Sequence, residues 1–316
     1  MPLIRVHTNM KKLFCIIILF LLIPFQLFAA TLYVTQSGAG NGTSYAQADS
    51  IYDFNVGNGE FASLDGDTVY ICDTIETSIT VPDGGADAGN RVTIRGDLAD
   101  HAFVKNYSTG TAAILISSKN YVTIQGFTII GTYQRGIKFL NSTYGEVDDC
   151  DISGTSGHFE GAVAFSSSDY GHVHDTTVGP QTCPTCGEND TEGIYFTLSD
   201  YGLVEDSIIH DIGGHGAIEW HESDYFVLRN NTVYESGVNS ADPNHMVDQL
   251  ISAIKGSNYS VVENNTMYES ENAINDEHLI GWKIHESGYH IFWYNTLYNI
   301  DNMALQSYTR DRKSVV

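Results

Sequence analysis

The sequence predicts an all-β solenoid, a fold in which successive turns of the chain stack along one axis, and three observations lead to it. A unit that spans residues 218–231 returns in similar form at 252–265 and again at 282–295. A tyrosine recurs at spacings of 23 to 34 residues, at Tyr121, Tyr144, Tyr170, Tyr201, Tyr225, Tyr259 and Tyr289. Apolar residues keep fixed offsets from these tyrosines although the spacing varies. Stacked repeats joined by loops of variable length produce this pattern.

The apolar offsets predict strands that face a common core. Three and eight residues after each tyrosine the side chain is always apolar. Seven residues before each tyrosine stand Ile114, Ile137, Val163, Ile194, Ile218, Ser252 and Trp282, and five before it stand Ile116, Phe139, Phe165, Phe196, Trp220, Ile254 and Ile284. Two inward positions separated by one outward position have the period of a β-strand. Because like residues would stack about 4.8 Å apart, the sequence predicts a parallel β-helix, with Ser252 as the one polar residue at these four offsets.

Asparagines mark a second fixed offset. Six residues after the tyrosine, the last three units carry Asn231, Asn265 and Asn295. Asparagine side chains in stacked tight turns hydrogen-bond from one rung to the next. We therefore interpret these asparagines, and the stacked tyrosines, as structural residues at corners or in the core rather than as a sugar-binding surface.

The first thirty residues predict export. Residues 1–30 combine Lys11 and Lys12, an apolar run and the pair Ala29-Ala30, which is the order of a secretory signal peptide. A transmembrane anchor is the alternative, and Pro24 together with the small residues that end the run disfavours it. We expect a secreted protein with no membrane span once this leader is removed.

The rest of the chain divides into three parts. Residues 31–100 are expected to form an N-terminal cap and the first rungs, because the first rung of a solenoid needs a cover. Residues 101–310 are expected to form the β-helix. Residues 311–316 resemble the in-frame reading of a sequencing adapter and interrupt a rung. We interpret them as a non-native tail of a truncated chain.

Charge and cysteine content restrict the partners. Three of the 15 Lys and Arg residues and none of the 39 acidic residues lie in the leader, which leaves a formal charge of −27. Such a surface repels nucleic acid and anionic membranes, so neither is an expected partner, and we expect a monomer. In an exported protein, Cys183 and Cys186 predict a loop disulfide more than a metal site, and Cys72 and Cys150 predict small core residues.

Ionisable residues gather at the outward positions of the last units. The first outward position of each unit holds, in order, Leu115, Lys138, Ala164, Tyr195, Glu219, Ala253 and Lys283. The second holds Ser117, Leu140, Ser166, Thr197, His221, Lys255 and His285. The connections that lead into these strands are long and add Asp242, His245, Asp248, Asp276, Glu277 and His278. Long loops beside one rigid face predict a functional site, although a face that only keeps the sheet soluble is the alternative.

The segment 248–258 resembles the lysine motif of the β-helix lyases that include alginate lyases and chondroitin B lyase. The resemblance implies that Asp248 helps to hold calcium and that Lys255 removes a proton. It places His285 at the position where that family has an arginine that serves as the acid in the reaction. Leu250 departs from the pattern, because the family has a second acidic residue there. The wider rung pattern and residues 31–96 resemble the pectate-lyase-like superfamily, which implies a right-handed parallel β-helix.

These residues predict a polysaccharide substrate and β-elimination on a uronic-acid polymer. Lys255 is the expected base, His285 or His221 the acid, and Lys283 or a loop-bound cation the group that neutralises the substrate carboxylate. Glu219, Tyr195 and His245 are expected to bind substrate, and Asp248, Asp242 and Glu277 to bind Ca²⁺. One alternative is a glycoside hydrolase that uses Glu219 with Asp248 or Glu277. The other is a non-catalytic adhesin or carbohydrate-binding solenoid.

Overall fold

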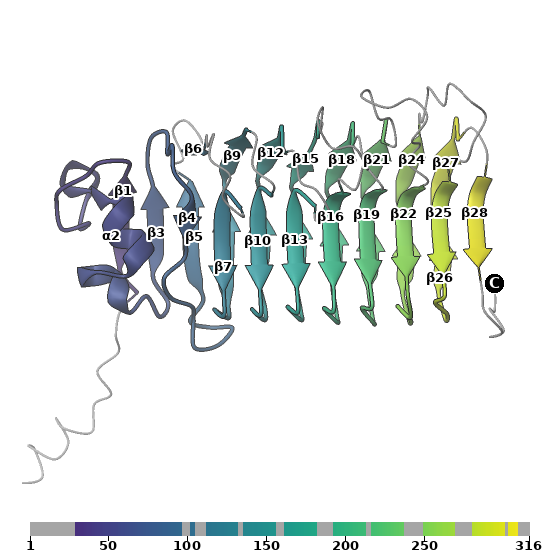
Figure 1. Ribbon diagram of the computed structural model, residues 1–316, viewed down its shortest axis with the longest axis horizontal. Coiled ribbons are helices and arrows are strands. Elements are labelled where there is room, and N and C mark those ends of the chain that lie inside the picture. The colour runs from purple at the N-terminus through teal and green to yellow at the C-terminus, as the bar shows by residue number, and fades with distance from the viewer. Residues whose placement is uncertain are drawn as a thin grey trace, which may run out of the picture.

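The chain winds through three parallel β-sheets, and from residue 79 onward each full turn adds one strand to each sheet. The computed structural model describes residues 29–96, 102–104, 112–131, 135–155, 161–181, 192–212, 216–236, 249–268, 280–300 and 303–308. Its strands stand side by side along one long axis (Figure 1). Every strand pairing in the described chain is parallel, for example that of Ile137–Leu140 with Val163–Ser166.

The strands fall into three sets, which we call sheets C, A and B in the order in which a turn visits them. Sheet C contains β4 (Ile79–Thr80), β7 (Ile114–Ser117), β10 (Ile137–Leu140), β13 (Val163–Ser166), β16 (Glu192–Thr197), β19 (Gly216–His221), β22 (Gln249–Ile254), β25 (Ile280–His285) and β28 (Met303–Tyr308). Sheet A contains β2 (Asp49–Ser50), β1 (Thr31–Thr35), β3 (Thr68–Ile71), β5 (Val92–Gly96), β8 (Val122–Gln125), β11 (Glu146–Asp148), β14 (His172–His174), β17 (Leu203–Glu205), β20 (Val227–Arg229), β23 (Val261–Glu263) and β26 (Ile291–Trp293). Sheet B contains β6 (Ala102–Val104), β9 (Phe127–Ile130), β12 (Asp151–Ser153), β15 (Thr177–Val178), β18 (Ile208–His210), β21 (Thr232–Tyr234), β24 (Thr266–Tyr268) and β27 (Thr296–Tyr298).

The core consists of like side chains stacked on like, as the offsets predicted. The rings of Phe139, Phe165 and Phe196 lie parallel in successive strands of sheet C, with centroids 4.7 and 4.5 Å apart. All three are fully buried. Burying a side chain of this size contributes about 2 kcal/mol, so repetition over many rungs stabilises the solenoid.

The recurring tyrosine occupies the corner between sheets C and A. Each of these tyrosines has a positive φ, such as 53° at Tyr121 and 62° at Tyr289. Their rings form one continuous stack, with neighbouring centroids 4.5 to 5.0 Å apart. Tyr170 and the later members are exposed. The corner prediction is confirmed.

Two polar ladders fix the corners. The side-chain amide of Asn265 donates to Asn295 Oδ1 at 2.9 Å, and its Oδ1 accepts from the backbone N–H of Asn231 at 2.9 Å. This confirms the predicted asparagine ladder, which lies between sheets A and B. A serine ladder that was not predicted lies between sheets C and A; in it the backbone N–H of Ser199 donates to Ser223 Oγ at 3.0 Å. Cys72 and Cys150 are buried, as predicted.

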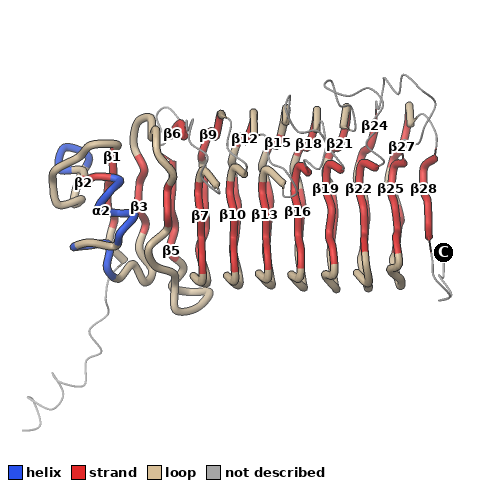
Figure 2. The backbone as a smooth tube through the Cα atoms, in the orientation of Figure 1, coloured by secondary structure: helices blue, strands red, loops and turns tan. Residues whose placement is uncertain are grey.

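The helical segments lie at the N-terminal end of the stack (Figure 2). They are η1 (Tyr45–Gln47), α2 (Ile51–Val56) and η2 (Gly59–Ala62). The helix α2 begins where Ser50 Oγ accepts a hydrogen bond from the backbone N–H of Asp53 at 3.0 Å, and it ends at Gly57 in the left-handed conformation. A capping role for residues 31–100 stays a prediction. No helix in the described part of the chain is long and apolar enough to cross a membrane.

Candidate functional site

The outward face of sheet C brings together most of the predicted site residues that the structure describes. In the first row, Tyr195 pairs with Glu219, Glu219 with Ser252, and Ser252 with Lys283. In the second row, His221 pairs with Ile254 and Ile254 with His285. These positions alternate with the buried core residues and therefore face outward. We call this set the sheet C strip; its members are Tyr195, Glu219, His221, Ser252, Lys283 and His285.

The structure corrects the predicted register of one rung. Ile251, not Ser252, lies beside the core residue Ile218, and Ala253 lies beside Trp220. Ser252 is therefore an outward neighbour of Glu219, the place predicted for Ala253. The prediction that Ser252 and Ile254 face the core is wrong.

The same shift moves Lys255 off the strand. Its backbone N–H donates to the carbonyl of His285 at 2.8 Å, and its φ of 49° places it in the corner after β22. This corner holds one residue more than its neighbours, Gly256, whose φ of 88° suits glycine. Accordingly, Ser257 Oγ donates to the carbonyl three residues back, whereas Ser223 Oγ donates to the carbonyl two residues back. The prediction that Lys255 stands beside His221 on the strand is wrong, because Ile254 takes that place.

Glu219 and Ser252 form a buried polar pair at the centre of the strip. The Ser252 hydroxyl donates to Glu219 Oε2 at 2.8 Å, and the two residues are 0% and 5% exposed. A carboxylate withdrawn from water is costly unless hydrogen bonds or charges compensate it. A buried carboxylate on an outward face therefore marks a part of the sheet that is sheltered from solvent.

The surroundings of His221 favour its neutral form. Burial and, after it, the positive charge of Lys255 lower the pKa of His221, while Glu222 acts in the opposite direction. Nδ1 of His221 lies 3.6 Å from Glu222 Oε1. Lys255 thus affects the strip electrostatically from the corner, although it is not a strand neighbour of His221. An imidazole that is neutral near neutral pH can accept a proton.

Several predicted residues lie outside the described part of the chain. They include the substrate-binding candidate His245 and the calcium candidates Asp242, Asp248 and Glu277, together with Asp276 and His278. Cys183 and Cys186 also lie outside it, as does most of the leader. The predicted calcium site, disulfide and signal peptide therefore stay predictions.

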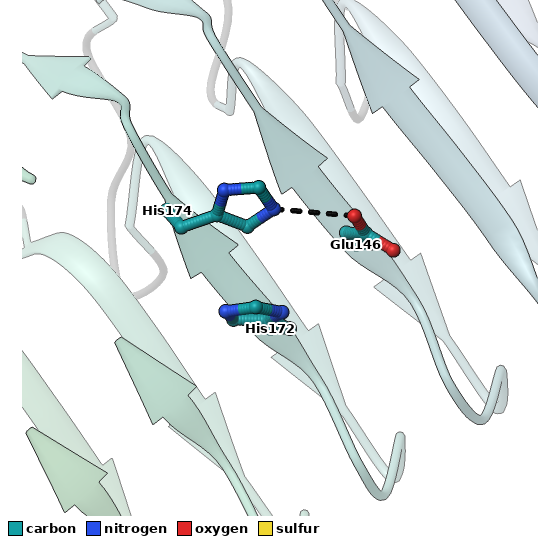
Figure 3. A group of neighbouring side chains, drawn as sticks. All are labelled: Glu146, His172 and His174. Atoms are coloured by element: carbon teal, nitrogen blue, oxygen red, sulfur yellow. Dashed lines mark hydrogen bonds and ion pairs between the residues drawn. The ribbon is translucent and has the colours of Figure 1, made fainter. Parts of the chain in front are cut away.

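A second cluster of ionisable side chains lies on sheet A, where no site was predicted. One ligand atom each from Glu146, His172 and His174 lies within 4.8 Å of the others (Figure 3). Burial and the neighbouring His174 lower the pKa of His172. The signal in the sequence was His172-Val-His174, since alternate residues of a strand share a face. The partner Glu146 comes from another rung and could be found only by applying the register to this sheet.

Comparisons with known proteins identify the fold. No protein-family model matches the sequence, and no curated protein is similar to it. An alginate lyase from Paenibacillus sp. str. FPU-7 superimposes with a TM-score of 0.61 at 16% identity, over 88% of this chain and 98% of that one. The pectate lyase Pel9A gives 0.60 at 10% identity, over 90% and 80%. A GH136 lacto-N-biosidase from Eubacterium ramulus gives 0.55 at 10% identity, over 89% and 67%.

Identities this low establish the fold and leave the activity open. The three parallel sheets and these similarities together confirm the predicted architecture. The chain has the right-handed parallel β-helix fold.

Proposed function

We propose that this protein is a secreted carbohydrate-active enzyme that cleaves a uronic-acid polymer by β-elimination at the sheet C strip. One observation carries the proposal: ionisable side chains of both signs, among them Glu219, His221 and Lys283, lie in register on one face and are partly or wholly withdrawn from water. Successive strands are about 4.8 Å apart, so the strip has room for one or two sugar units. The presence of an alginate lyase and a pectate lyase among proteins of the same fold supports this substrate class.

His221 is the proposed base. In β-elimination a base takes the proton next to the substrate carboxylate, the electron pair of that bond forms a carbon–carbon double bond, and the bond to the 4-oxygen breaks. A base must be unprotonated to act, and the lowered pKa of His221 meets this condition. His221 thus takes the role that the sequence predicted for Lys255. Lys255 instead supplies positive charge beside His221, where it would neutralise the substrate carboxylate.

Tyr195 is the proposed proton donor for the leaving oxygen. His285 and His221 belong to strands two rungs apart, a separation of about 10 Å. That is too far for an acid and a base that act on adjacent carbons. Tyr195 stands on β16, the strand next to that of His221, in the row of Glu219; it therefore lies diagonally from His221, at about 7 to 8 Å, a distance that a tyrosine side chain can span. His285 and Lys283 would then bind a neighbouring sugar unit.

A glycoside hydrolase is the second candidate, and the buried carboxylate of Glu219 favours it. In that reaction two carboxyl groups flank the glycosidic bond, one as acid and the other as base or nucleophile. Glu219 would be one of them, and the other would come from Asp248 or Glu277. The lacto-N-biosidase similarity shows a glycosidase of this fold.

Products distinguish the candidates. The full-length chain is incubated with a panel of uronate and neutral polysaccharides, and ultraviolet absorbance and reducing ends are measured in the same samples. Elimination predicts that every new reducing end is matched by one absorbing, unsaturated end. Reducing ends without absorbance would refute elimination in favour of hydrolysis, and binding without either would indicate an adhesin.

We further propose that Asp242, Asp248 and Glu277 would hold a Ca²⁺ ion, since carboxylate oxygens are the ligands that Ca²⁺ prefers. Its expected effect is to neutralise substrate carboxylates near the strip. Activity should then fall after treatment with EGTA and return with added Ca²⁺. Activity that EGTA leaves unchanged would show that calcium is not required, and the role proposed for His221 would stand.

A further inference from the structure

Three side chains on sheet A converge across two neighbouring rungs. His172 and His174 are alternate residues of β14, and Glu146 is the residue of β11 that pairs with His172. The two imidazole rings lie one above the other with centroids 4.3 Å apart, beside the carboxylate (Figure 3). Nε2 of His174 is 3.1 Å from Glu146 Oε1. All three side chains are partly accessible to solvent, between 18% and 30% exposed.

Carboxylates outside this group fix the orientation of both imidazoles. Nδ1 of His174 is hydrogen-bonded to Asp175 Oδ2 at 2.9 Å and lies 3.3 Å from Asp148 Oδ1. Nε2 of His172 is hydrogen-bonded to Glu205 Oε1 at 2.9 Å. Each ring therefore has one nitrogen held by a carboxylate outside the group, and Nε2 of His174 faces Glu146. Metal-binding histidines show this arrangement, in which an outer carboxylate fixes the ring.

Two arginines hold the carboxylates in turn. Arg91 lies 2.9 Å from Glu146 Oε2, which leaves Oε1 on the side of His174. Arg229 pairs with Glu205 Oε2 at 2.5 Å, on the oxygen opposite the one that holds His172. The ligand atoms are thus oriented before any ion binds, and little side-chain entropy remains to be lost.

From this geometry we infer that Glu146, His172 and His174 form a binding site for a divalent transition-metal ion such as Zn²⁺. Two imidazole nitrogens and one carboxylate oxygen suit Zn²⁺, Ni²⁺ or Cu²⁺, whereas Ca²⁺ and Mg²⁺ prefer oxygen ligands. Three protein ligands leave a coordination position for water. The ion would join β11 to β14, and thereby clamp two successive rungs of the solenoid.

The site lies on sheet A and not on the sheet C strip. The ion is therefore expected to change stability and not turnover, so the inference can fail while the proposed function stands, and the reverse. A set of plain ion pairs between strands would account for the same hydrogen bonds. Ion pairs alone, unlike a metal site, predict that the stability of the protein does not depend on Zn²⁺.

Calorimetric titration of the tag-free, full-length protein with Zn²⁺ tests the inference. The chain has 12 histidines, and others among them can also bind Zn²⁺ in the titration. Each variant is therefore judged by the single binding event that it removes. His172→Asn and His174→Asn should each lose one equivalent of Zn²⁺, or bind it at least about tenfold more weakly. Glu146→Gln, which keeps both imidazoles, serves as a second variant should either histidine change disturb folding. His210→Asn is the matched control, since His210 is also hydrogen-bonded to an aspartate, at 2.7 Å, but lies on sheet B.

The same samples give a second readout. Zn²⁺ should raise the thermal midpoint of the parent protein and of His210→Asn, and the three ligand variants should lose this rise. Ca²⁺ should produce no rise that depends on His172 or His174. Zn²⁺ stoichiometry, affinity and thermal response that are the same in the parent and all three ligand variants would overturn the inference.

Discussion

The hydroxyl of Ser252 donates a 2.8 Å hydrogen bond to the carboxylate of Glu219, and both side chains are buried on the outward face of the solenoid. Outward side chains of a β-helix usually lie in water, where a carboxylate needs no partner. Here β22 supplies a hydroxyl directly beside the carboxylate of β19. This pair therefore belongs to a sheltered polar strip.

Removing the hydroxyl should cost stability. Ser252→Ala leaves a buried carboxylate without one of its donors, so the free energy of unfolding should fall by about 2 kcal/mol. Urea denaturation measures it. Ser236→Ala is the control: Ser236 is equally buried, but its hydroxyl donates to the neutral carbonyl of Tyr234, so the loss should be about 1 kcal/mol. Equal losses would show that the charge of Glu219 adds nothing to the bond.

The acid limb of the pH–activity profile should report His221. Its lowered pKa places the limb below pH 6.5, with activity lost as the imidazole gains a proton. Lys255→Met removes a charge that lowers this pKa, so the limb of kcat/KM should move to higher pH. Glu222→Gln removes a charge that raises it, so the limb should move to lower pH. Limbs that stay in place, or that move in the same direction, would contradict the assignment of His221 as the base.

The asparagine ladder should tolerate serine better than alanine. Asn265 is 1% exposed, and its amide donates to the carbonyls of Leu228 and Glu263, both at 3.0 Å. Asn265→Ala should lower the free energy of unfolding by at least about 3 kcal/mol, because several buried groups lose partners. Asn265→Ser should lose less, since Ser207 already fills the same ladder position two rungs earlier, where its hydroxyl donates to the backbone carbonyl of Glu205. Equal losses would mean that the ladder depends on amide geometry alone.

His290 should make the protein sensitive to acid. Burial lowers its pKa from 6.5 to about 4, and neither ring nitrogen has a hydrogen-bond partner in the described structure. The unfolded chain takes up a proton below about pH 6.5, whereas the folded chain does so only near pH 4. Stability is therefore lost as the pH falls through this window, by roughly 3 kcal/mol in total.

His290→Phe should remove that part of the loss while keeping the edge-on contact with Trp282. Unfolding free energies at pH 7 and pH 4, compared between variant and parent, measure the difference. A variant as acid-sensitive as the parent would show that other groups carry the effect.

Most of the fold could be predicted from the sequence because each rung repeats the same physical requirements. The stack of Phe139, Phe165 and Phe196, the corner tyrosines and the asparagines of the turns all follow from fixed offsets. The exception is the rung of Ser252, where counting back from Tyr259 crosses the extra residue Gly256. A polar residue at a core offset, next to a glycine that no other corner has in that place, was the signal of the shift.

The site was harder to predict because it depends on side chains from different rungs. The pairing of Ser252 with Glu219 appears only in the corrected register, and the effect of Lys255 on His221 acts across a corner and not along a strand. The cluster of Glu146 and His174 lies on a sheet whose outward residues the offsets did not address. Which charged side chains of different rungs lie near one another depends on the folded structure, and the local sequence pattern does not show it.

Cleavage of the polymer at the sheet C strip, with His221 as the base, is tested by the initial rate at which the His221→Ala protein forms unsaturated product. We predict a rate about 10²- to 10⁴-fold below that of the parent, with His210→Ala, on sheet B, unchanged. A His221→Ala protein that forms the unsaturated product at the parental rate would show that His221 is not the base.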